Sequence, residues 1–203
     1  MATRTAVTPE RAPVRERLLA AATELFYREG INKVGIDRII ERAGVAKASL
    51  YDSFGSKDEL VRAYLESRHE ARQARMRDKQ ARYSKPRERL LGVFDAMGDL
   101  FDDPNFKGCA FVRASAEVAA DSRARGVCDS NRSWIRELFT GLAKDAGVKH
   151  PDKLVQQLVL LYDGASISAQ MDGNVGAAAA ARAVAASLLD AALPAGARPK
   201  AQK

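Results

Sequence analysis

The amino-acid sequence predicts an all-α protein of about nine helices, and three observations support this fold class. Apolar residues recur every three or four positions through most of the 203 residues, which is the period of an amphipathic helix. Breaks rich in glycine, proline or asparagine separate these periodic segments. No stretch of useful length alternates like a half-buried strand, and we find no internal repeat and no nucleotide-binding glycine loop. With 46% apolar and 29% charged residues, the composition is that of a folded globular protein.

The first predicted helix covers about Pro13 to Glu29 and ends at Gly30. Its apolar face follows the helical repeat and consists of Val14, Leu18, Ala21, Leu25 and Phe26. Residues 1 to about 12 are expected to form a loose arm whose Arg4 and Arg11 give it a weakly basic character.

Two short helices joined by a tight glycine turn follow. The first is predicted at Ile36 to Ala43, and Gly44 can take the left-handed conformation that ends a helix. The second is predicted at Ala46 to Phe54, with Leu50 facing inward and polar side chains facing outward. Such a pair is typical of the helix-turn-helix motif, whose second helix enters the major groove of DNA.

The residues around this turn also resemble a known family. The segment AGVAKASLYDSFGSKDEL, residues 43–60, is similar to the DNA-binding signature of the TetR family of bacterial transcriptional regulators. The later GCAFVRASAE, residues 108–117, and the length near 200 residues resemble that family too. With this resemblance, we expect a three-helix DNA-binding domain at residues 1–60. A helical effector-binding and dimerisation domain is expected at 61–195, followed by a disordered tail at 196–203.

Six residues of this motif are predicted to contact DNA. They are Lys47, Ser49, Tyr51, Asp52, Ser53 and Lys57. Lysine suits a phosphate or a guanine edge, and a lysine at a helix N-terminus adds its charge to the unused backbone N–H groups there. The family resemblance supports Lys47, Ser49, Tyr51 and Lys57. Asp52 departs from the family pattern, because a carboxylate repels phosphate and favours only the amino group of cytosine. Gly35 and Ala46 stand where a hydroxyl cap is common, which weakens two helix starts.

The remaining segments are predicted to be helical as well. Ser56 caps the fourth helix, with Glu59 completing a capping box, and this helix continues to about Tyr83. A fifth helix follows the break at Pro86 and ends near Phe101. The predicted bounds of the next helices are about Lys107–Ala120, Gly126–Ala146, from Pro151 to before Gly173, and Val175–Leu193.

The second half carries aromatic, soft and polar residues that are candidates for an effector pocket. They are Phe94, Met97, Phe101, Phe111, Arg113, Trp134, Tyr162 and Ser166. The same residues suit an ordinary apolar core, and the sequence leaves both interpretations open. The last two helices are rich in small residues, such as Gly164, Ala169 and Ala181, which let helices approach closely. The resemblance favours a homodimer formed through these helices over packing within one chain.

Charge, cysteine and histidine content narrow the function further. The net charge is +7, and its excess falls in residues 61–90, which contain ten basic and four acidic residues. This charge either helps to hold phosphates or forms a solvated helix face. Cys109 and Cys128 are expected to be buried thiols, because neither has a basic neighbour placed to lower its pKa. His69 and His150 lack metal-ligand partners, so no metal and no cofactor is predicted. No apolar run or signal-like start suggests export, so we expect a cytoplasmic protein.

The favoured function is that of a DNA-binding regulator, most simply a repressor that a small-molecule effector releases from a palindromic operator. The alternatives are an effector-independent or architectural DNA-binding protein and, with less support, an all-α enzyme. No paired carboxylates or Cys-His set supports catalysis, so we do not expect an enzyme. Repressor and activator are not distinguished by these residues, nor are the effector and the operator.

Overall fold

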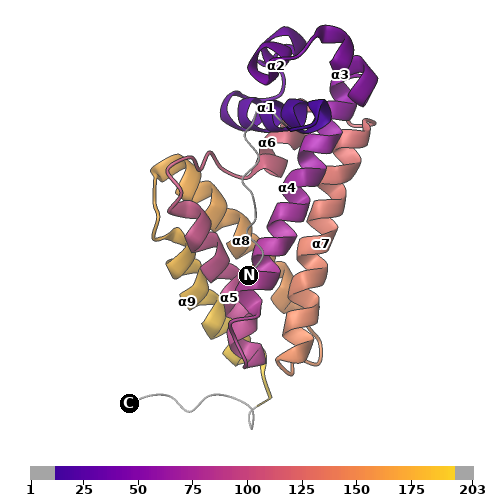
Figure 1. Cartoon of the computed structure of the whole chain (residues 1–203). Helices are drawn as coiled ribbons and strands as arrows, with labels where there is room; N and C mark the ends of the chain where they lie inside the picture. The colour runs from indigo at the N-terminus through magenta and orange to yellow at the C-terminus, as the bar shows by residue number, and fades with distance from the viewer. Residues whose placement is uncertain (1–11, 195–203) are drawn as a thin grey trace, which may run out of the picture. The chain divides into compact units, whose positions relative to one another are not determined.

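The computed structural model describes residues 12–194 (Figure 1). Within this range the chain forms nine α-helices and no strand, which confirms the predicted all-α fold class. The predicted arm, up to residue 11, and the predicted tail at 196–203 lie outside the described residues. The helices are α1 (Val14–Glu29), α2 (Ile36–Ala43), α3 (Lys47–Phe54), α4 (Lys57–Gln80), α5 (Pro86–Phe101), α6 (Ala110–Glu117), α7 (Arg123–Asp145), α8 (Asp152–Asp172) and α9 (Ala177–Ala192).

The largest differences from the predicted bounds are at α4, which ends at Gln80 rather than near Tyr83, and at α6 and α7. Helix α6 is shorter than predicted, and the preceding Gly108 has a φ of +92°, which is outside the helical region. Helix α7 begins at Arg123, three residues before the predicted start at Gly126. The Ser122 hydroxyl accepts the Arg125 backbone N–H at 3.2 Å, so Ser122 is the cap from which the helix starts.

The contacts between residues divide the chain into two compact units. Among the described residues, the first unit combines 12–68 with 110–129, and the second combines 69–109 with 130–194. Each unit is therefore built from two separate stretches, and the long helices α4 and α7 each contribute to both.

In the first unit, α1 packs against α2 and α3 (Figure 1). The apolar face of α1 is buried from Leu18 to Phe26, and the Phe26 ring lies 5.6 Å from that of Tyr64 on α4. Ile39 anchors α2 and Leu50 anchors α3, and both side chains are fully buried. Because α2 and α3 have only eight residues each, this packing rather than intrinsic propensity stabilises them.

In the second unit, α5 packs against α8 and α9. Phe94 and Phe139 are fully buried, with ring centroids 5.9 Å apart, and Phe139 meets Tyr162 edge-on at 6.1 Å. Alanines on the inner face of α9, such as Ala181 and Ala185, are also buried and allow close helix packing.

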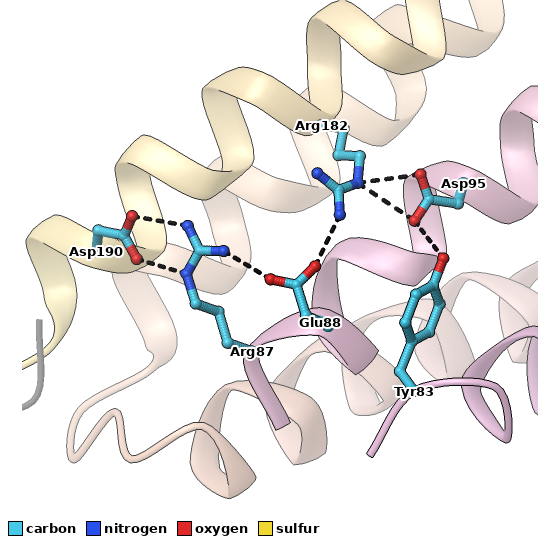
Figure 2. A network of polar contacts seen from close by, with 6 residues as sticks. All are labelled: Tyr83, Arg87, Glu88, Asp95, Arg182 and Asp190. Atoms are coloured by element: carbon cyan, nitrogen blue, oxygen red, sulfur yellow. Dashed lines mark hydrogen bonds and ion pairs between the residues drawn. The ribbon is translucent and has the colours of Figure 1, made fainter. Parts of the chain in front are cut away.

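A network of ion pairs joins α5 to α9 (Figure 2). Arg87 binds Asp190 in a two-pronged arrangement, with both N–O distances 2.8 Å. Its third nitrogen donates to Glu88 at 2.8 Å. Glu88 accepts in turn from Arg182, at 2.8 Å. Four side chains from two helices therefore form one continuous chain of charge-assisted hydrogen bonds.

The network ends at the segment that connects α4 with α5. Arg182 also binds Asp95 at 3.0 Å, and the hydroxyl of Tyr83 donates to Asp95 at 2.7 Å (Figure 2). This hydrogen bond, together with burial, raises the pKa of Tyr83 above its ordinary value. The Tyr83 ring also covers Gly92 so closely that a Cβ at this position would lie 2.5 Å from Cε2.

For the range 12–194, no helix combines the length and the apolar character that crossing a bilayer would require.

Candidate DNA-binding interface

The turn between α2 and α3 has the geometry that the sequence predicts. Gly44 is left-handed, with φ +63° and ψ +44°. Its N–H donates to the Glu41 carbonyl, and the Val45 N–H donates to the Ile40 carbonyl, both at 3.1 Å. These bonds satisfy two of the carbonyls that a helix leaves unpaired at its C-terminus.

The outer face of α3 is polar. Lys47, Tyr51 and Asp52 are exposed, and Ser49 and Ser53 are half-buried. Tyr51 is 45% exposed, which is unusual for an aromatic residue in a small helix and leaves its ring and hydroxyl available to a partner. The fully buried Leu50 fixes the opposite side of the helix, so these polar side chains are displayed together.

The two predicted phosphate-binding lysines have partners within the chain. Lys47 forms an ion pair with Asp37 at 3.1 Å, and this hydrogen bond raises the pKa of Lys47. The pair is largely exposed, so water and salt screen it strongly. The ammonium of Lys57 donates to the Ile31 carbonyl at 2.8 Å and lies 5.9 Å from the centre of the Phe26 ring.

Only half of the predicted capping box forms at the start of α4. The Ser56 hydroxyl accepts the Glu59 backbone N–H at 3.2 Å, as predicted. The Glu59 carboxylate instead binds Arg62 at 2.7 Å and Arg123 at 3.2 Å. These cations hold the carboxylate away from Ser56, and the Arg62 hydrogen bond keeps the pKa of Glu59 low.

The basic excess of residues 61–90 is largely engaged in contacts within the chain. Arg62 binds Glu59 and Glu66, and Lys79 binds Asp99 at 2.7 Å. Arg87 belongs to the network of Figure 2. Part of the excess therefore forms ion pairs within and between helices, which the sequence alone did not indicate.

Helix α6 holds the end of α1 and the connection to α2. Arg113 donates to the Tyr27 carbonyl at 2.6 Å. Glu117 accepts the Asn32 backbone N–H at 2.8 Å, and the Asn32 amide donates to the Glu117 carbonyl at 3.3 Å. The sequence did not reveal these contacts, because residues about 85 positions away supply the partners.

The predicted effector-binding residues are divided between the two units. Phe111 and Arg113 belong to the first unit, and the other six belong to the second. Of those six, four are buried in the core of the second unit, and Trp134 packs against it half-buried. The four are Phe94, Met97, Phe101 and Tyr162. The half-buried Ser166 hydroxyl donates to the Tyr162 carbonyl at 3.1 Å.

Next to this core lies a group of buried polar side chains. Arg72 and Asn131 are only 8% and 5% exposed, and the guanidinium donates to the Asn131 side-chain oxygen at 3.2 Å. The His69 Nδ1 lies 3.3 Å from the same oxygen, and its ring meets Trp134 edge-on. Arg72 also donates to the Cys109 sulfur at 3.3 Å.

The contact between Arg72 and Cys109 corrects the expectation that neither thiol has a basic neighbour. The guanidinium lies 37 positions away in sequence, so local spacing did not reveal it. Cys109 is half-buried rather than buried, whereas Cys128 is buried as predicted. Neither forms a disulfide in the structure.

Some of the small residues of the last two helices face the core of their own chain, whereas others, among them Gly164, are exposed. Ala165, Ala169 and Ala181 are all buried. The exposed surface of α8 instead carries large apolar side chains, with Leu160 at 64% and Met171 at 77% exposure.

Comparisons with known proteins agree with this arrangement. Residues 18–64 match the family model described as "Bacterial regulatory proteins, tetR family". The crystal structure of a putative TetR transcriptional regulator from Streptomyces avermitilis is 34% identical to this chain. The similarity covers 89% of this chain and 98% of that one, with a TM-score of 0.78.

Two characterised regulators are more distant in sequence. The transcriptional activator FasR of Mycolicibacterium smegmatis is 29% identical over 66% of this chain, and the match spans 61% of FasR, somewhat less than two thirds of its length. The transcriptional repressor NemR of Escherichia coli is 26% identical over 77% of this chain and 84% of its own length.

The helix-turn-helix geometry and these similarities lead to one conclusion. The chain belongs to the TetR family and is a DNA-binding transcriptional regulator.

Proposed function

We propose that the chain is a repressor that binds an inverted-repeat operator as a homodimer and is released by a small-molecule effector. The outer face of α3 is the observation that supports DNA binding. It carries polar side chains and an exposed tyrosine, and the buried Leu50 holds the opposite side of the helix. A helix presented in this way fits the major groove of B-DNA.

Within this proposal the six predicted residues have different roles. Lys47 exchanges its exposed partner Asp37 for a phosphate. Lys57 binds a phosphate through the ammonium N–H groups that do not donate to the Ile31 carbonyl. Ser49, Ser53 and Tyr51 donate hydrogen bonds to phosphates or base edges. Asp52 contributes base preference, because a carboxylate in the groove is favourable only beside a cytosine amino group.

The exposed apolar side chains of α8 and α9 support a dimer interface through these two helices. Leu160, Ile167 and Met171 recur at spacings of seven and four, so they share one face of α8. Val184 of α9 is 48% exposed. Replacing Leu160 by Glu should weaken the dimer in sedimentation experiments, whereas Ser133→Glu is a control that makes the same change of charge at a polar exposed position.

The core of the second unit supports an effector of apolar or aromatic character and modest size. Aromatic rings and Met97 supply an apolar environment, and the buried Arg72 and Asn131, with the half-buried His69, supply polar groups nearby. The complete burial of Phe94 and Phe139 instead favours the alternative, a DNA-binding protein that needs no effector. Thermal-shift screening of small aromatic compounds distinguishes the two, because only the first predicts a compound that raises Tm and weakens DNA binding together.

Among regulators with this fold, NemR is named a repressor and FasR an activator. We favour repression because occupancy of two adjacent grooves blocks a promoter without any further contact to polymerase. In vitro transcription from a promoter overlapping the bound site separates the two: a repressor lowers transcript yield, and an activator raises it.

Selection of DNA from a random-sequence library by the full chain tests the DNA-binding proposal. We expect an inverted repeat whose half-sites are centred about 34–36 Å apart. Tyr51→Ala should weaken binding to the selected duplex, whereas Tyr83→Phe, a change far from α3 in sequence, should leave it unchanged. Failure to enrich any sequence, or an undiminished affinity of Tyr51→Ala, would contradict the proposal.

A further inference from the structure

The start of α3 is not fixed by local capping. The N-cap residue Ala46 has no side-chain acceptor, and Gly35, which precedes α2, has none either. The two bonds of the Gly44 turn satisfy the carbonyls of Glu41 and Ile40 only. The carbonyls of Ala43 and Gly44, which lie in the turn itself, need partners from elsewhere.

Arg17 of α1 supplies those partners. Its Nε and Nη2 donate to the Ala43 carbonyl at 3.0 and 2.7 Å, and Nη2 also donates to the Gly44 carbonyl at 2.6 Å. The guanidinium thus lies at the C-terminal, negative end of the α2 dipole. A Cβ on Gly44 would lie only 2.9 Å from Nη2, so the absence of a side chain at this position makes the approach possible.

A second arginine of the same helix lies against the other end of α3. The Arg15 guanidinium lies 4.8 Å from the centre of the Phe54 ring, and Phe54 is the last residue of α3. A cation over an aromatic face at this distance is attractive. Helix α1 therefore contacts the last residue of α3 directly, and it binds the turn that precedes α3 through three hydrogen bonds to backbone atoms.

We propose that Arg17 is a positioning residue for operator recognition: it orients α3 by binding the carbonyls of the turn and does not itself read bases. The inference rests on the proposed role of α3 in the major groove. A rotation of α3 moves every base contact at once, whereas non-specific binding depends mainly on phosphate charge and tolerates such a rotation.

The rival role is a direct phosphate contact. Arg17 is only half-buried and borders a hollow of about 600 Å³ that also touches Ala20, Glu24 and Arg42. A third possibility is a contribution to stability alone. The three roles differ in measurable ways, because only positioning changes the ratio of specific to non-specific affinity without changing the salt dependence.

The experiment compares Arg17→Met and Arg17→Lys in the full chain. Arg28→Met is the matched control, since it removes the same charge from the same helix at a side chain that is 66% exposed. Each protein is titrated with a duplex selected by the wild-type chain and with a scrambled duplex of equal composition, at several salt concentrations. Wild-type selection of a sequence tests the proposed function separately, before any variant is compared.

Positioning predicts that Arg17→Met loses about tenfold in affinity for the selected duplex, in line with the loss of charged hydrogen bonds. Affinity for the scrambled duplex and the salt slope should stay at the values of Arg28→Met. Arg17→Lys keeps the charge but reaches fewer carbonyls. Its affinity for the selected duplex should therefore lie between those of wild type and Arg17→Met.

Three outcomes would overturn the proposal. An equal loss on both duplexes with a salt slope lower by about one unit, relative to Arg28→Met, indicates a phosphate contact. An equal loss on both duplexes with an unchanged slope indicates lowered stability only. Unchanged affinities indicate no role. If Arg17→Met fails to fold, as circular dichroism would reveal, the same comparison is decided by Arg17→Lys.

Discussion

Both units contain ion pairs, such as Arg42–Glu24 in the first, but a different group of polar contacts stands out inside each unit. In the first unit, cationic side chains donate to backbone carbonyls: Arg17 to the α2–α3 turn, Arg113 to the end of α1, and Lys57 to Ile31. In the second unit, α5 and α9 are joined by a network of side chains of opposite charge, including Arg182 and Asp190 (Figure 2).

The difference has a physical consequence. A backbone carbonyl neither titrates nor exchanges its partner for a counterion, and its position is fixed by the chain. Contacts of this kind define the backbone of a turn, which suits a unit that must present α3 in one orientation. Carboxylates titrate, are screened by salt and sit on flexible side chains, so the second network aligns helices while remaining sensitive to conditions.

The largest effect is expected where the network depends on close packing. Gly92→Ala places a methyl group against the Tyr83 ring and displaces the hydroxyl from Asp95, so unfolding free energy should fall by about 1–3 kcal/mol. Gly98→Ala on the same helix meets only Ala178 at 3.7 Å and should stabilise α5 by up to about 1 kcal/mol. Urea titration measures both. Equal effects at the two glycines would show that Tyr83 moves aside without cost.

Salt should separate the two kinds of contact. Arg182→Met removes the centre of the network and should cost about 1 kcal/mol at low salt, a value already reduced because the side chains are about one third exposed. The loss should shrink as ionic strength rises. The loss from Arg17→Met should persist, because its partners are uncharged. Hydrogen exchange of amides in α9 and in α3 monitors each unit separately. If the stability losses of Arg182→Met and Arg17→Met depended on salt in the same way, the two kinds of contact would not differ as stated.

A smaller effect is expected from pH. Arg87 lowers the pKa of Asp190 below its ordinary 3.8, so this carboxylate contributes stability above that pH and loses it as the pH falls through the lowered value. Tyr83 has a pKa raised above 10.0, so its contribution is complete below pH 10 and is lost as the pH rises through the raised value. Wild type should therefore be more stable than Asp190→Asn at neutral pH but not in acid. It should be more stable than Tyr83→Phe at neutral pH but not in alkali. An advantage independent of pH would contradict these assignments.

The smallest change concerns the exposed pair beside the DNA-binding face. Asp37→Asn removes the partner of Lys47 and one negative charge, while both side chains are largely in water. Stability should hardly change, since exposed pairs contribute little. Binding to selected and scrambled duplexes should tighten together, more at low salt than at high salt. Tightening on the selected duplex alone would instead assign Asp37 a role in base preference.

The sequence predicted those features that depend on residues close together along the chain. The helical repeat placed α1 to α3, Gly44 predicted the left-handed turn, and Ala46 and Gly35 predicted helix starts without a side-chain cap. Ser56 was correctly identified as the cap of α4.

The features that the sequence did not predict depend on distant pairs. Arg17 and the turn it binds are 26 positions apart, Arg113 and Tyr27 are 86 apart, and Arg87 and Asp190 are 103 apart. Many arginines have equivalent local surroundings, so only the packing of helices decides which of them meets a carbonyl. For the same reason the basic excess after residue 60 was not recognised as a source of ion pairs within the chain.

The central claim, that α3 enters the major groove of each half-site, is tested most directly by cleavage mapping. A DNA-cleaving reagent is attached to Asp52→Cys in the full chain, with the wild-type chain as the control for reaction at Cys109 and Cys128, and with Lys149→Cys as a second exposed position. If α3 enters the groove, position 52 should direct strong cleavage at two places, one in each half-site and about 34–36 Å apart. Cleavage no stronger than that of wild type or of Lys149→Cys would contradict it.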